Sequence, residues 1–108
     1  MDPFTWLEER RPPAPAPLLA AMRSELERFQ AGERDALSDR LANTALSTLA
    51  EVADGAGGRP EASRLLAVDA LLTYAFEAAA EAGPATLTAL VQRLGAGRFE
   101  SLLEGRAA

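Results

Sequence analysis

Apolar residues recur three and four positions apart through most of this chain, and polar residues fill the positions between them. That spacing places the apolar side chains on one face of an α-helix. A strand would show strict alternation and many β-branched residues, and the sequence contains no such run. The pattern therefore predicts an all-α protein, a compact bundle of four to five helices with a short N-terminal helical arm.

Proline and glycine set the expected helix boundaries, because proline suits the first helical turn and glycine suits the position just after the last one. The segments expected to be helical are residues 3–10, 17–31, 33–54, 60–82, 84–94 and 98–104. The expected interruptions are the prolines at 12–17, Gly32, the glycine-rich run 54–60, the Gly83-Pro84 pair and the run 95–97.

The prolines near the N-terminus predict a division of the chain. Closely spaced prolines disfavour helix and favour an extended connection, so we expect an aromatic arm at 1–11, a linker at 12–17 and a single helical domain at 18–108. The arm carries Phe4, Trp6 and Leu7, which are candidate interaction residues because aromatic side chains bury large areas. The arm either folds back on the body or docks on a partner.

The stretch LAVDALLTYAFE, residues 66–77, is apolar on most sides of its helix, which is typical of a central helix contacted by several neighbours. Asp69, Thr73 and Glu77 stand four apart and form one polar stripe, and Tyr74 lies beside it. If the stripe reaches solvent, Asp69 is an edge residue. If Asp69 is buried, it needs a partner such as an arginine, because an unpaired buried carboxylate is costly.

Composition limits the possible chemistry. The chain has 108 residues, enough for one small domain of marginal stability, so a partner that covers part of its surface is expected to help. It contains no cysteine, no histidine and no lysine. Thiolate nucleophiles, histidine bases, Schiff-base chemistry and the usual transition-metal ligands are therefore excluded. We expect no enzyme activity, no catalytic residue, no cofactor and no bound metal.

Charge and hydropathy bear on partners and location. The net charge of −5 opposes binding to nucleic acid, which is a polyanion. No run reaches the ~20 uncharged apolar residues that span a bilayer, and the acidic start does not resemble a signal peptide. We therefore expect a cytoplasmic protein without nucleic-acid binding or membrane insertion.

Three motifs bear on the possible chemistry. The carboxylate pairs Glu8/Glu9, Glu25/Glu27 and Asp35/Asp39 can in principle share acid and base roles, but none lies in a recognisable metal-binding loop. The glycine-rich run 54–60 lacks the Gly-Lys-Ser/Thr ending of a phosphate-binding loop. Residues 85–103 have the sequence pattern of a helix-turn-helix, in which a glycine-containing turn joins two helices. The second of these helices, however, carries glutamates where DNA would lie. Each is interpreted as structural.

The stretch at 66–77 resembles one helix of the trans-isoprenyl diphosphate synthases, all-α enzymes that condense allylic diphosphates with isopentenyl diphosphate. The resemblance covers about twelve residues, and Val68 stands where that family usually has glycine. The family binds diphosphate through magnesium on aspartate-rich motifs, and this chain has no adjacent aspartate pair and no lysine. The resemblance therefore implies a similar packed helix.

Two functions remain open from the sequence. The first is a small non-catalytic protein that acts through protein–protein contacts, as an adaptor, an accessory subunit or a self-assembling module, with a protein partner or a second copy. The alternative is a helical protein that binds a small molecule, a lipid or an isoprenoid in an apolar pocket near Asp69 and Tyr74.

Overall fold

The computed structural model describes residues 2–30, 35–55 and 58–107, with side chains as far as Gly95. Within these residues it contains helices and no strand, which confirms the all-α prediction. The helices are α1 (Pro3–Glu8), α2 (Ala16–Arg28), α3 (Leu37–Ala53), α4 (Arg59–Ala82) and α5 (Pro84–Ala107).

Helix α1 begins as the sequence predicts. Asp2 is its N-cap, and its carboxylate accepts a hydrogen bond of 3.0 Å from the backbone N–H of Thr5. Pro3 occupies the first turn, where its missing N–H leaves no helical bond unmade. This cap fixes a helix of only six residues, which would be marginal in isolation.

The break predicted at residues 95–97 is wrong. Helix α5 runs without interruption from Pro84 to Ala107, so residues 84–94 and 98–104 belong to one helix. Glycine inside a helix costs only ~1 kcal/mol relative to alanine, whereas proline costs about 3. Two glycines among good helix formers are therefore tolerated, and the turn that a helix-turn-helix needs is absent from α5.

The ends of α2 and α3 differ from the predicted boundaries. Helix α2 ends at Arg28, where Phe29 leaves helical geometry with φ −111° and ψ 70°. Helix α3 starts at Leu37. The predicted terminator Gly32 and the predicted start at Glu33 lie outside the described residues.

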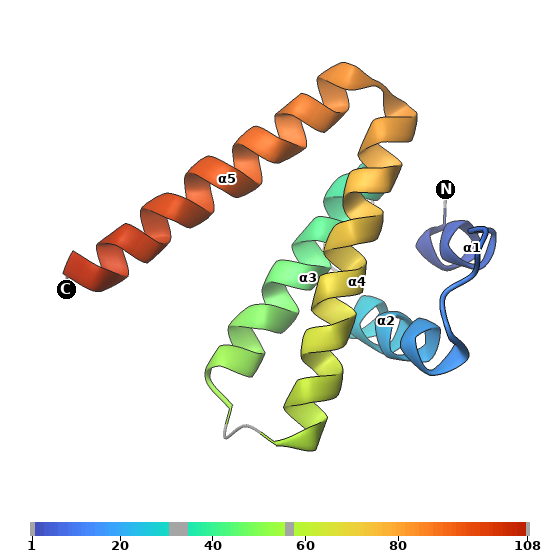
Figure 1. The fold of residues 1–108 in the computed structure, drawn as a ribbon, viewed down its shortest axis with the longest axis horizontal. Helices are drawn as coiled ribbons and strands as arrows, with labels where there is room; N and C mark the ends of the chain where they lie inside the picture. Colours follow the sequence, from blue (N-terminus) through green and yellow to red (C-terminus); the bar gives the residue numbers. More distant parts are fainter. Residues whose placement is uncertain (1, 31–34, 56–57, 108) are drawn as a thin grey trace.

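Helix α4 is the centre of the structure. Helices α3 and α4 lie side by side and antiparallel, α1 and α2 lie on one side of this pair, and α5 leaves the end of α4 toward the other side (Figure 1). Gly83 makes the turn between α4 and α5 with φ 134°, in a region that residues other than glycine rarely adopt. The second half of α5 points away from the other helices (Figure 1).

Small residues make up much of the buried surface of α3 and α4. Ala42 and Ala45 on α3, and Ala67, Ala75 and Ala79 on α4, are fully buried. Short side chains allow two helix axes to approach closely. Other apolar residues of α4 are less covered: Leu65 is 45% exposed, and Leu72 and Phe76 are only partly buried.

Candidate functional site

The aromatic arm folds back on the body. Trp6 and Leu7 are only 3% and 2% exposed and belong to the hydrophobic core, so neither is an exposed anchor for a partner. Phe4 is partly buried against α2, where the guanidinium of Arg23 lies 5.0 Å from the centre of its ring. Of the three predicted interaction residues, Phe4 alone keeps part of its surface accessible.

Trp6 anchors the arm to α4 through its polar edge as well as its ring. The indole Nε1 donates a hydrogen bond of 3.1 Å to Glu81, and Arg10 donates to the other oxygen of the same carboxylate. Arg10 also lies 3.9 Å from the centre of the Trp6 ring, and Tyr74 meets that ring edge to face at 6.0 Å. The hydrogen bonds from Arg10 and then from Trp6 lower the pKa of Glu81.

The predicted polar stripe reaches solvent. Asp69, Thr73 and Glu77 are exposed, and the hydroxyl of Thr73 donates a hydrogen bond of 2.9 Å to the backbone carbonyl of Asp69. Asp69 is therefore an edge residue and does not need a buried partner. Glu77 is 3.8 Å from Arg10, a distant ion pair.

These stripe residues do line one surface hollow. It is an open depression of about 400 Å³ between the arm and α4, with charged groups from both. Its lining residues are Arg10, Arg11, Pro12, Leu18, Asp69, Ala70, Thr73, Tyr74 and Glu77. The hollow is thus open to solvent and lined by charged residues of both signs together with apolar ones, at the place where the sequence predicts a pocket beside Asp69 and Tyr74.

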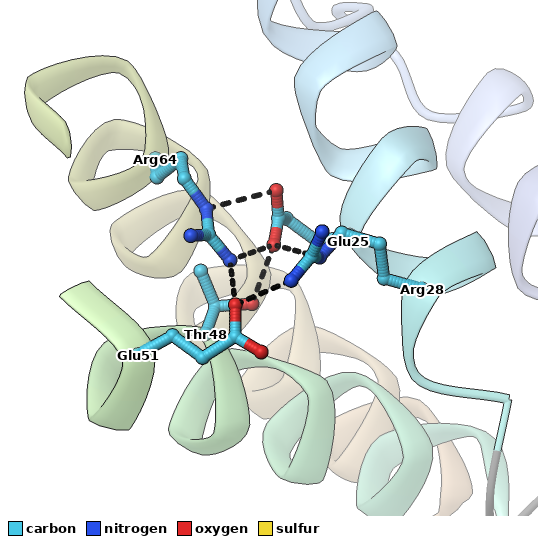
Figure 2. A network of polar contacts seen from close by, with 5 residues as sticks. All are labelled: Glu25, Arg28, Thr48, Glu51 and Arg64. Carbon is cyan, nitrogen blue, oxygen red and sulfur yellow. Dashed lines mark hydrogen bonds and ion pairs between the residues drawn. The ribbon is translucent and has the colours of Figure 1, made fainter. Parts of the chain in front are cut away.

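A second polar cluster joins three helices near the start of α4. We call it the interhelical clamp, and it consists of Glu25 and Arg28 on α2, Thr48 and Glu51 on α3, and Arg64 on α4 (Figure 2). Figure 2 shows the guanidinium of Arg64 reaching both carboxylates. Its Nη2 lies 2.8 Å from Glu25 Oε1 and 2.7 Å from Glu51 Oε1.

Every carboxylate of the clamp is occupied by donors. Glu25, whose side chain is 7% exposed, also accepts 3.0 Å from the hydroxyl of Thr48, and Glu51 accepts 2.6 Å from Arg28. The hydrogen bond from Arg64 lowers the pKa of Glu51, with Arg28 acting in the same direction. The bonds from Glu25 and then Glu51 raise the pKa of Arg64. Two carboxylates and two guanidiniums make a neutral cluster whose arrangement suits a structural role.

The sequence pattern did not predict the clamp as a unit. Glu25 and Thr48 are 23 positions apart, and Glu25 and Arg64 are 39 apart, so no local spacing connects them. One signal was present: Glu25 falls three positions after Met22 and seven after Leu18, which places a charged residue on the apolar face of its helix.

An apolar groove opens between three helices on the side of α3 and α4 away from α2. We call it the α5 groove; it measures about 330 Å³ and is lined almost entirely by apolar atoms of Leu46, Leu72, Phe76, Val91, Leu94 and Gly95. Val91 is 49% exposed. A second apolar hollow, which includes Leu49, Val52 and Leu65, lies between α3 and α4 near the 55–58 connection.

The groove lies beside the buried residues of α3 and α4. Leu46, Leu72 and Phe76 are only partly buried and line the groove, and α5 diverges from the α3–α4 pair (Figure 1). The α5 groove depends on the direction in which α5 leaves α4, and no spacing along the chain predicts that direction.

The described residues contain no group of three or more carboxylates arranged to hold a metal ion. Across the same part of the chain, no helix is both long enough and apolar enough to cross a membrane.

Comparisons of this chain with protein-family models, with curated proteins and with solved structures find no match, so the resemblance of residues 66–77 to the isoprenyl diphosphate synthases stays a prediction.

Proposed function

We propose that this protein is non-catalytic and acts through protein–protein contact, with the α5 groove as its contact surface. The observation that carries the proposal is the apolar groove itself, with Val91 half exposed at its edge. Exposed apolar side chains gathered in a concave surface favour association, because burying them removes apolar area from water. A groove between helices suits the apolar face of another helix.

The arrangement of the carboxylates supports the non-catalytic part of the proposal. In the pair Glu25/Glu27, Glu25 is held in the clamp and Glu27 pairs with Arg23 on its own helix at 3.3 Å. A general acid or base needs a carboxylate whose proton is free to move to a substrate. Both carboxylates instead already accept hydrogen bonds from arginine side chains.

The second acidic pair is occupied in the same way. Asp39 lies 3.2 Å from Arg93 of α5, and Asp35 accepts a long hydrogen bond of 3.4 Å from Asn43. Asp39 thus ties α3 to α5 near the groove. This use of the carboxylate favours a role in architecture over one in acid–base chemistry.

Site-specific photo-crosslinking in the native host tests the proposal. A photoreactive amino acid at Val91 should give crosslinked protein products, because this position lies at the edge of the groove. The same amino acid at Ser24, which is exposed on α2 away from the groove, is the matched control. Equal or absent crosslinking at the two positions contradicts the proposal.

The hollow beside the polar stripe favours a second candidate function. Arg10 and Arg11 can attract an anionic group, while Leu18, Pro12 and Tyr74 offer apolar contact, so an amphipathic small molecule matches the lining. A prenyl diphosphate combines both characters and is also the class suggested by the resemblance of residues 66–77.

Thermal unfolding with added ligands tests this candidate. A prenyl diphosphate should raise the melting temperature of the wild-type protein and have a smaller effect on the Arg11→Ala variant, because Arg11 is exposed and lines the hollow. The matching prenyl alcohol, which lacks the anionic group, is the control. No stabilisation at saturating ligand removes the candidate.

A further inference from the structure

We propose that the α5 groove binds α5 of a second copy of this chain, so that two copies form a two-fold symmetric dimer. The inference rests on the proposed function, in which the groove is a contact surface, and it names the partner. Three features of the described residues lead to it: the apolar lining of the groove, the neutral ion pair near it, and the direction of α5.

The first feature is that α5 forms one wall of the groove and carries the apolar face needed to fill it. Leu87, Val91 and Leu94 stand at i, i+4 and i+7 on one face of the helix. Val91 is 49% exposed and Leu94 is partly buried, although Leu90 beside them is buried. In a two-fold dimer the same patch of each copy meets its own equivalent, so an apolar patch on α5 is matched by an apolar patch.

The second feature is charge. The groove lining has no charged side chain, and near it lies the pair Asp39–Arg93, with both side chains 44% exposed. Asp39 precedes Leu46 by two helical turns on the same face of α3, and Arg93 is adjacent to Leu94. One positive and one negative group near the site favour neither a strongly acidic nor a strongly basic partner. A two-fold axis instead brings Arg93 of each copy toward Asp39 of the other.

The third feature is the direction of α5. The helix is 24 residues long, and its second half points away from α3 and α4 (Figure 1). A helical segment of about twelve residues is marginal in water without packing. An antiparallel α5 from a second copy that lies along the α5 groove would pack against this helix and support both copies of it.

Sedimentation of the purified full chain tests the inference, from about 1 µM to about 1 mM, the range of weak to moderate association. Wild-type protein should convert from monomer to dimer as its concentration rises. Val91→Glu should weaken the dimer at least ~100-fold, because it buries an unpaired charge. Leu66→Glu is the matched control, since Leu66 is 64% exposed on α4 outside the groove lining, and it should leave the dimer unchanged. Circular dichroism should show that both variants keep their helices.

A charge-exchange experiment tests the two-fold geometry. Asp39→Arg and Arg93→Asp should each weaken self-association, because each places like charges together. Mixed in equal amounts, the two variants should form a heterodimer, because every contact between copies then joins opposite charges. If the mixture associates no better than either variant alone, the pair acts only within one chain and the two-fold arrangement is overturned.

The outcomes separate the two proposals. A wild-type chain that stays monomeric over the whole range overturns the second-copy inference. If Val91 still crosslinks to a different protein in the host, the proposed function stands without it. If the wild-type chain does not self-associate and the photoreactive amino acid at position 91 gives no crosslinks, both proposals fail.

Discussion

The carboxylate of Glu25 lies between helices, where donors from two other helices reach it. Arg64 makes two hydrogen bonds to its carboxylate and Thr48 makes a third. A buried charge is tolerated when it is paired and hydrogen-bonded in this way. The residue thus joins α2 to α3 and α4, where an apolar residue at the same position would only fill space.

Replacing Glu25 by alanine should lower the free energy of unfolding by about 3 kcal/mol, because it leaves partly buried donors without their acceptor. Glu27→Ala is the matched control on the same helix, since Glu27 is exposed and its pair with Arg23 is worth less than ~1 kcal/mol. Chemical denaturation of the two variants measures the difference. Similar losses for both would show that the clamp does not stabilise the fold.

At the scale of the element, α5 shows how weakly a sequence pattern fixes a helix end. Glycine at positions 95 and 97 suggested a turn, yet the helix continues through both. Gly83 does end a helix, because its φ of 134° is strained for other residues and Pro84 follows it. Glycine therefore ends a helix at position 83 and continues one at position 95.

Alanine substitutions at these two glycines should have opposite effects. Gly95→Ala should stabilise the monomer by ~1 kcal/mol, because the position is helical and a methyl group meets nothing within 4 Å. Gly83→Ala should destabilise it by about 1–3 kcal/mol through backbone strain, although space is also open there. Thermal unfolding at low concentration measures both. A destabilising Gly95→Ala would argue for a break at this position.

Much of the architecture at this scale followed from the sequence, and most of the candidate site did not. Periodicity and the positions of the prolines located the helices and the central position of α4, because these depend on neighbours along the chain. The clamp and the α5 groove depend on contacts between distant segments and on the angle at which α5 leaves α4. No local spacing encodes that angle.

At the scale of the whole molecule, stability depends on arginine–carboxylate contacts at several helix junctions. Glu51 joins α3 to α2 and α4, and Glu81 joins α4 to the arm. Both carboxyl groups have a pKa below their ordinary value of 4.5. A group whose pKa is lowered by folding stabilises the folded state above its ordinary pKa, and that contribution is lost as the pH falls through the lowered value.

We therefore expect the melting temperature to fall as the pH is lowered below 4.5. Circular dichroism at a series of pH values measures it. The variant Glu81→Gln should be less stable at neutral pH and should lose less stability on acidification, because one of the titrating groups has been removed. Added salt should reduce the difference, since both carboxylates are near solvent. A Glu81→Gln curve parallel to that of the wild type would contradict this assignment.

Trp6 is the one tryptophan in the chain, and its indole is buried between the arm and α4. The intrinsic fluorescence of this protein therefore comes from a single junction. Release of the arm would shift the emission to longer wavelength while the helix content stays almost constant, because α1 contributes only six residues. Tryptophan fluorescence and circular dichroism recorded together can thus separate opening of the arm from unfolding of the bundle.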